Sequence, residues 1–276
     1  MSLKLDDIKL SNKKISILNR KPFPFFCWDN FLPTDVYKEL EACWPDDSYF
    51  KSSIYGGKQS IQKNQSDLVE KFFDKNKIWR DLLCLFDSQQ FIDDAKQFIK
   101  PLQFPHRPII SMKKWKLNKQ KNLSNFFTTN EVEIDWELSR YNKDNFLSPH
   151  TDRLTKYISL LLYFPDRKWN QSYGGGTVMY ESKEKKYERN WGNVYIPLEY
   201  MNKVKTFEYI ENRMVGFIKT ANSWHGVEPI NQPSNIYRKA LAINISLSEK
   251  SIISFSNRVK ESFVRRISYN RFKNID

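Results

Sequence analysis

Whole classes of protein are excluded by what this sequence does not contain. No apolar run approaches the roughly 20 residues that a membrane-spanning helix needs. Residues 1–14 contain no uninterrupted apolar segment of the kind found in a signal peptide, so we expect no secretion signal. Internal repeats and low-complexity linkers are also missing, which argues against a repeat architecture.

Cysteine is scarce as well. The three cysteines are Cys27, Cys43 and Cys84. Their number is odd and their spacing matches no metal motif. We therefore expect free thiols and a location in the reducing cytoplasm.

The charge balance is strongly basic. The net charge of +13 could indicate an acidic partner such as nucleic acid, phospholipid or an anionic glycan. The lysines are scattered, however, and often stand beside Asp or Glu, as in 183–189, which favours a solvated surface. Nucleic-acid binding would also predict aromatic residues interleaved with lysines on one sheet face, and no such pattern is found. Positive charge is concentrated only at 257–274, which predicts a basic, partly amphipathic helix or an ordered tail.

The first hundred residues have mostly helical patterns. The chain has 276 residues, of which 40% are apolar and 15% aromatic, and this is enough for a globular protein with a sizeable core. A strand is expected at 22–31 and a helix at 35–44. Residues 66–100 are expected to be helical, with a break near Asp87 and Ser88, either of which could cap the second part.

The rest of the chain has strand patterns. Residues 131–141 alternate strictly between apolar and polar side chains, which predicts a strand with one apolar face. Residues 157–164 form an apolar run interrupted only by Ser159, which predicts a strand buried on both faces. Helices followed by many antiparallel strands predict an α+β fold, a β-sandwich or jelly roll buttressed by helices. Further short strands are expected at 174–181, 193–198, 214–220 and 238–246.

One of only three histidines stands just ahead of an apolar strand. His150 lies two residues before Asp152, and residues i and i+2 of a strand point to the same face. With a second imidazole, the two side chains would form the two-His-one-carboxylate triad, which binds Fe(II) and leaves three positions open. A His-x-Asp pair is weak support for such a site by itself.

Two later residues strengthen this pattern. His225 follows the expected strand at 214–220, and Arg238 opens the next one. A histidine at the end of one strand and an arginine on the next are expected near the same mouth of a barrel.

Residues 131–247 contain four ordered blocks, which read "ELSRYNKDNFLSPHTD", "LLLYFPDRKWNQSYGGGTVMY", "VGFIKTANSWHGV" and "YRKALAINI". The first block is a strand ending in Tyr, a short loop and His-x-Asp. The second is an apolar strand ending in Tyr, then a loop with Trp and a Gly pair. The third is a strand followed by His and Val, and the fourth is an Arg that opens the last core strand. Together the blocks resemble the Fe(II)- and 2-oxoglutarate-dependent dioxygenases, in particular their prolyl-4-hydroxylase-like branch.

This resemblance implies a double-stranded β-helix, the cupin-like jelly roll, in which His150, Asp152 and His225 hold Fe(II). It also implies 2-oxoglutarate as cosubstrate and O2 as oxidant, with ascorbate as a further candidate cofactor. The carboxylate of Asp152 argues against the halogenating variant of the family, which lacks it.

The resemblance also implies a set of residues for 2-oxoglutarate. Arg238 suits the far carboxylate, because a guanidinium fork pairs two N–H groups with two carboxylate oxygens. Tyr163 would add a hydroxyl to the same carboxylate, Tyr141 would reach the metal-bound end, and Thr220 is a weaker candidate. Many members have Ser two residues after the Arg, whereas here the residue is Ala240, which gives Tyr163 more weight as the partner.

Two neighbouring features bear on this assignment. The segment 226–237 between His225 and the arginine is a little long, and Lys239 is the next residue, although strand alternation should turn it away from Arg238. The glycines at 174–176 precede neither a helix nor Gly-Lys-Ser/Thr, which predicts a tight turn and not a phosphate loop.

The resemblance implies one dioxygenase domain over 1–276, with a mainly helical support region at 1–130, the jelly-roll core at 131–247 and a basic tail at 248–276. The implied reaction hydroxylates an unactivated C–H bond and releases succinate and CO2. The acceptor is left open among peptidyl proline, an amino acid, and a small or glycan-linked metabolite. The alternatives are a basic nucleic-acid-binding protein, with a DNA-repair dioxygenase as a variant, and a non-catalytic jelly-roll module. The repair branch carries a second arginine shortly after the first, and none follows Arg238 on its strand; the intact triad argues against the non-catalytic module.

The acceptor pocket is expected to be shaped by the helical N-terminal third and by loops at 48–65 and 113–130. Glu137 and Ser139 share a strand face with Tyr141, so we expect them to look into the barrel.

Overall fold

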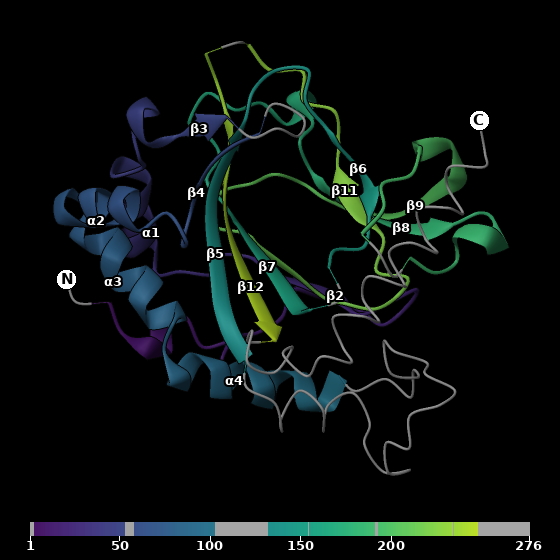
Figure 1. Cartoon of the computed structure of the whole chain (residues 1–276), viewed down its shortest axis with the longest axis horizontal. Helices are drawn as coiled ribbons and strands as arrows, with labels where there is room; N and C mark the ends of the chain where they lie inside the picture. Colours follow the sequence, from purple (N-terminus) through teal and green to yellow (C-terminus); the bar gives the residue numbers. More distant parts are fainter. Residues whose placement is uncertain are drawn as a thin grey trace.

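Two antiparallel sheets face each other and form a jelly roll, with helices packed on the outside of the larger sheet (Figure 1). The computed structural model describes residues 3–52, 58–102, 132–153, 155–190, 193–233 and 235–247.

The larger sheet has eight strands, and the smaller one has four. In spatial order, the larger sheet contains β1 (Ile17–Asn19), β2 (Phe25–Trp28), β10 (Met214–Ile218), β7 (Lys156–Tyr163), β12 (Arg238–Leu247), β5 (Val132–Tyr141), β4 (Lys58–Gln62) and β3 (Lys51–Ser52). The smaller sheet contains β6 (Leu147–His150), β11 (His225–Val227), β8 (Thr177–Ser182) and β9 (Met201–Phe207).

The helices lie on the side of the larger sheet that faces away from the smaller one (Figure 1). Ser88 caps the N-terminus of α4 (Gln89–Ile99) by accepting a hydrogen bond from the backbone N–H of Phe91. Of the two caps that the sequence suggests, Asp87 and Ser88, the structure therefore uses Ser88. Four α-helices are described, α1 (Thr34–Ala42), α2 (Ser66–Lys75), α3 (Lys77–Phe86) and α4 (Gln89–Ile99), together with short 3₁₀ turns at Leu5–Asp7, Asp47–Tyr49, Lys100–Leu102, Gln171–Tyr173, Lys185–Tyr187 and Leu198–Tyr200.

The two faces of the larger sheet have different chemistry. Its outer face packs apolar side chains such as Trp136, Leu160 and Ile243 against the helices in one continuous core. Its inner face carries polar side chains from the same strands, because successive strand residues point to opposite sides. Tyr141, Ser139 and Glu137 stand in register with Arg238, Ala240 and Ala242 on this inner face. The strict alternation of β5 therefore places its polar side chains inside the barrel, as its sequence predicts.

Several sequence predictions of single elements are wrong. The segment 193–198 is not a strand. Ile196 N–H donates to Pro149 O, but Pro197 has no N–H with which to continue a strand ladder, and the chain then enters the 3₁₀ turn Leu198–Tyr200. The helical reading of the first hundred residues missed strands β1, β3 and β4.

Two predicted segments, the loop at 113–130 and the basic tail at 248–276, lie outside the described residues. Cys27, Cys43 and Cys84 are free in the structure, as the sequence predicts. Among the described residues, none of the helices has both the length and the apolar character needed to cross a bilayer.

Candidate iron and 2-oxoglutarate site

The structure brings His150, Asp152 and His225 together at one end of the barrel. Each offers one ligand atom, and these atoms all lie within 4.8 Å of one another. His150 ends β6 and His225 begins β11, and the two residues are direct partners in the antiparallel register of the smaller sheet. The strand pairing therefore sets the distance between the two imidazoles, whose ring centroids are 4.2 Å apart.

Backbone carbonyls fix the tautomer of both imidazoles. His150 Nδ1 lies 3.0 Å from Ser148 O, and His225 Nδ1 lies 2.9 Å from Ser223 O. A carbonyl can only accept, so each Nδ1 carries the proton and each Nε2 presents its lone pair to the centre of the triad. Burial lowers the pKa of both imidazoles, that of His225 to about 3, so both are neutral and ready to act as ligands.

Asp152 occupies an unusual backbone position. Its φ of +65° lies in the left-handed region, which aspartate tolerates better than most residues. Its Oδ1 lies 3.0 Å from Lys156 Nζ, and its Oδ2 accepts a hydrogen bond from Ser159 at 3.0 Å. Burial alone would raise the pKa of this carboxyl, but Lys156 and the imidazoles hold it well below its usual range. The carboxylate is thus anionic and oriented toward the histidines.

Two neutral imidazoles and one carboxylate are the donor set that suits a divalent first-row metal such as Fe(II). The Nε2 atoms of His150 and His225 lie 3.7 and 3.6 Å from the Asp152 oxygens, whereas the Nδ1 atoms are engaged by backbone carbonyls. The residues present therefore fit the metal that the sequence resemblance implies.

A buried lysine stands behind the triad. Lys219 directly follows β10 and is 0% exposed, and its Nζ has no hydrogen-bond partner among the residues that the structure describes. Phe217, two residues earlier on the same face, packs on the His225 ring with centroids 4.1 Å apart. Burial lowers the pKa of Lys219 to about 7, while the nearby charge of Asp152 opposes that shift. Nothing in the sequence pattern singled out this residue.

Arg238 is a buried cation with neutral partners. It is 2% exposed, its Nε donates to Gly175 O at 2.5 Å, and one terminal nitrogen donates to Thr177 Oγ1 at 3.4 Å. In the part of the chain that the structure describes, it forms no ion pair with a carboxylate. A buried guanidinium that lacks a counter-charge is the feature expected of an anion-binding position.

Tyrosine rings surround this guanidinium. Its central carbon lies 5.7, 5.3 and 5.0 Å from the ring centroids of Tyr141, Tyr163 and Tyr209. Tyr163 donates its hydroxyl to Thr177 Oγ1. The structure thus brings Arg238, Tyr163 and Tyr141 together, as expected, and adds Tyr209 and Thr177, which no sequence motif had indicated.

Thr220 is placed apart from the polar contacts of this cluster. Its hydroxyl donates to Asn222 Oδ1, and its N–H donates to Ser223 Oγ, so it builds the turn that leads into His225. The glycines at 174–176 follow the 3₁₀ turn Gln171–Tyr173 and lead into β8, and Gly174 and Gly175 have φ of +74° and +76°. A Cβ at Gly175 would lie 3.2 Å from the Arg238 side chain, so the glycine allows that side chain its place.

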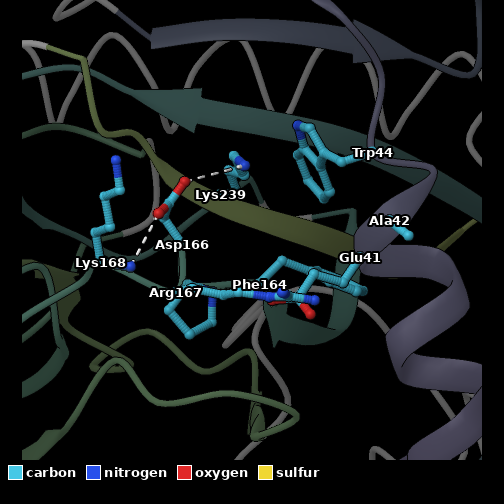
Figure 2. A pocket seen from close by; sticks show the side chains of 9 residues that line it. Glu41, Ala42, Trp44, Phe164, Asp166, Arg167, Lys168 and Lys239 are labelled. Atoms are coloured by element: carbon cyan, nitrogen blue, oxygen red, sulfur yellow. Dashed lines mark hydrogen bonds and ion pairs between the residues drawn. The ribbon is translucent and has the colours of Figure 1, made fainter.

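Lys239 points to the opposite side of β12, as strand alternation predicts. Its side chain lines a hollow of about 340 Å³ on the outer face, between the end of α1 and the loop that follows β7 (Figure 2). Its Nζ lies 4.0 Å from Asp166 and 5.8 Å from the centre of the Trp44 ring. Neighbouring residues of one strand therefore serve an inner site and an outer hollow.

Comparisons with known proteins complete this picture. Solved structures similar to this chain include a Pseudomonas putida prolyl-4-hydroxylase (16% identity, 81% of this chain and 92% of that one, TM-score 0.46). They also include a Trichoplax adhaerens prolyl hydroxylase in complex with a peptide fragment of the hypoxia inducible factor oxygen degradation domain (13% identity, 83% and 86%, TM-score 0.44). A third is IDO from Bacillus thuringiensis (12% identity, 82% and 93%, TM-score 0.45). No curated protein matches the chain at a significant level.

The model of the 2OG-Fe(II) oxygenase superfamily matches residues 136–246. This segment contains both histidines and the carboxylate of the triad, as well as the arginine and the tyrosines of the anion-binding position. The part of the chain that carries His150, Asp152, His225 and Arg238 is therefore similar to the 2OG-Fe(II) oxygenase superfamily.

Proposed function

We propose that this oxygenase holds Fe(II) with His150, Asp152 and His225, binds 2-oxoglutarate with Arg238, and hydroxylates an unactivated C–H bond of an acceptor. The observation that carries the proposal is the triad itself, whose ligand atoms lie within 4.8 Å of one another in a buried setting. When bound, iron and 2-oxoglutarate supply the oxidising power, with O2 consumed and succinate and CO2 released.

The residues of this chain provide binding and orientation. The carbonyls of Ser148 and Ser223 hold the two imidazoles with Nε2 facing inward, and Lys156 and Ser159 hold the Asp152 carboxylate. These contacts fix the ligands before a metal arrives, which lowers the cost of ordering them on binding.

The arginine cluster suits the far carboxylate of 2-oxoglutarate. Arg238 offers guanidinium donors in a pocket of neutral groups, and Thr177 accepts from both Arg238 and Tyr163. Because Thr177 Oγ1 accepts in both bonds, its own proton is left for an anion. Tyr141, in register with Arg238, would contact the metal-bound end of the cosubstrate, and Thr220 would act only through the turn before His225.

The proposal includes several finer points. The acceptor is a small molecule or a peptide, ascorbate serves as an accessory reductant as in the enzymes that the sequence resembles, and the three free cysteines suit a cytoplasmic location. The chain acts as one domain over 1–276, with the core at 131–247 and a support region at 1–130.

Succinate release tests this function directly. The purified protein is incubated with Fe(II), 2-oxoglutarate and O2, first without an acceptor and then with candidate acceptors, and products are analysed for the mass gain of one oxygen. We expect slow release without an acceptor and faster release with the right one. Release that is unaffected by removing iron, or that persists in the His150→Ala/His225→Ala double variant, would show that the function is misassigned.

A further inference from the structure

An ion pair lies on the inner face of the larger sheet, at the edge away from the arginine cluster. Lys58 of β4 and Glu137 of β5 are joined by a short ion pair, and Gln62 Nε2 donates to the other Glu137 oxygen at 3.0 Å. The side chains of Lys58 and Glu137 remain 26% and 16% exposed, so both can be reached by a small molecule. The pair is therefore inside the barrel but not sealed.

Both members of the pair are charged. Burial would lower the pKa of Lys58, yet its neighbours Tyr141 and Glu137 raise it above its ordinary value. Burial would raise the pKa of Glu137, yet Lys58 lowers it. An ammonium and a carboxylate that are both partly exposed on the inner face of the sheet offer opposite charges to a ligand that reaches them.

This pair faces the triad across the mouth of the barrel. Tyr195 stacks on the His150 ring with centroids 4.8 Å apart, and it lies close enough to Lys58 to affect the pKa of that amine. Figure 1 shows β4 and β5 on one side of the interior, with β6 and β11 on the other. Lys58 is also in register with Tyr141, next to the expected path of 2-oxoglutarate. The space between Lys58, Glu137 and Tyr195 is therefore the part of the mouth beside the metal ligand His150.

We propose that the acceptor is a small zwitterion that carries both a carboxylate and an ammonium group, and that Lys58 and Glu137 bind these two groups. This proposal rests on the function proposed above. A carboxylate of the acceptor replaces Glu137 as the partner of Lys58, and its ammonium takes the place of Lys58 beside Glu137, so no charge is left unpaired. Asp135, on the same inner face of β5 and exposed, adds a second carboxylate near the ammonium.

The chemistry of the pair disfavours an internal peptide segment as the acceptor. An uncharged backbone would separate Lys58 from Glu137 without supplying the opposite charges, and buried charges that lose their partners are costly. A free amino acid, or another molecule with the same two groups, meets both requirements.

Binding is measured by calorimetry on protein loaded with Mn(II) and 2-oxoglutarate, so that no turnover is needed. The probes are the free L-amino acids, each also as its N-acetyl derivative and its carboxamide, and a proline-containing peptide blocked at both ends. We expect at least one free amino acid to bind, and its two derivatives to bind at least about thirtyfold more weakly, the usual effect of truncating one member of a charge pair. Equal or tighter binding by the blocked peptide, or no binding by any free amino acid, would overturn the proposal.

Variants assign each charge to its residue. In Lys58→Met the free amino acid and its carboxamide should bind alike, and in Glu137→Gln the free amino acid and its N-acetyl form should bind alike. Lys38→Met, which removes an exposed lysine paired with Glu211, is the matched control and should leave the discrimination unchanged. If Lys58→Met and Glu137→Gln both still bind the free amino acid much more tightly than its derivatives, the two residues do not bind the charged groups of the acceptor.

Failure of the proposed function is read separately. Succinate release without an acceptor depends on the triad and Arg238, not on Lys58 or Glu137. If that release is absent while calorimetry shows zwitterion binding, the hydroxylase assignment fails and the binding site stands. If that release is present while zwitterions do not bind, the hydroxylase assignment stands and the proposed zwitterion site fails.

Discussion

Tyr163 donates its hydroxyl to Thr177 Oγ1 at 2.5 Å and so links the larger sheet to the smaller one next to Arg238. We expect Tyr163→Phe and Thr177→Val each to raise the 2-oxoglutarate concentration needed for half-maximal succinate release about fivefold. One neutral hydrogen bond contributes about 1 kcal/mol, which corresponds to that factor. Because the two residues share one bond, the double variant should cost less than the sum of the single variants. Strict additivity would show that they act independently.

Arg238 gives a stronger prediction. Arg238→Ala should raise the 2-oxoglutarate requirement at least about thirtyfold, because truncating one partner of a desolvated charge pair costs roughly 2–5 kcal/mol. Arg238→Lys should also be impaired, since a point charge replaces a planar fork. Mn(II) binding by calorimetry should survive in both variants, because no metal ligand changes.

Lys239→Ala is the control for Arg238, because Lys239 lines the hollow on the other side of β12. It should leave the 2-oxoglutarate requirement unchanged. The reverse result, with Lys239→Ala impaired and Arg238→Ala normal, would mean that the inner face of β12 is assigned to the wrong residues.

The metal ligands are tested by metal affinity. His150→Ala or His225→Ala should abolish Fe(II)-dependent succinate release and weaken Mn(II) binding, because each removes one of three ligands. Circular dichroism verifies that the variants fold. Asp87→Ala removes an exposed carboxylate that pairs with Lys63, and this variant should bind Mn(II) normally. Native Mn(II) affinity in both histidine variants would place the metal elsewhere.

Lys219 predicts a pH dependence of stability. Its pKa is lowered to about 7 in the folded protein, from an ordinary value of 10.5, so between these values the unfolded chain binds the extra proton. The contribution of this group to the free energy of unfolding therefore rises with pH between about 7 and 10.5, and falls as the pH drops toward 7. Lys219→Met should remove this rise, which amounts to at most about 5 kcal/mol because one pKa unit corresponds to about 1.36 kcal/mol.

Urea unfolding of the metal-free protein, with a chelator present, measures this effect at several pH values between 7 and 10. The difference between native protein and Lys219→Met isolates this group from other lysines and tyrosines that titrate in the same range. Lys38→Met, at an exposed position, should give a curve parallel to that of the native protein. A constant difference between native protein and Lys219→Met would show that the buried amine keeps an ordinary pKa.

The sequence predicts the elements whose pattern is long and regular. The alternation of β5 and the apolar run of β7 were sufficient because ten and eight residues repeat one pattern. Short strands escaped prediction: β6, β11 and β4 have four, three and five residues, and each of them pairs with at least one strand far away in the chain. Their strand character comes from tertiary pairing and not from local preference.

The candidate site follows the same rule. The triad and Arg238 lie within the four sequence blocks that resemble the dioxygenase family, so this resemblance implied their roles. Thr177 and Lys219 could not, because each matters only through a neighbour from another strand. The stacking of Tyr195 on His150 could not be predicted either, because Tyr195 lies in the segment 193–198, which was expected to be a strand and is irregular in the structure.

The order of strands in the two sheets has a consequence for how the protein matures. β11 lies between β6 and β8, and β12 lies between β7 and β5, so the last strands to be synthesised are inserted between strands made earlier. His225 and Arg238 arrive with these late strands. A nascent chain that already contains His150 and Asp152 thus has only two of the three proposed ligands, and both sheets still lack a strand. On the function proposed above, iron would be captured only when these late strands close the barrel, so an incomplete chain would bind the metal weakly.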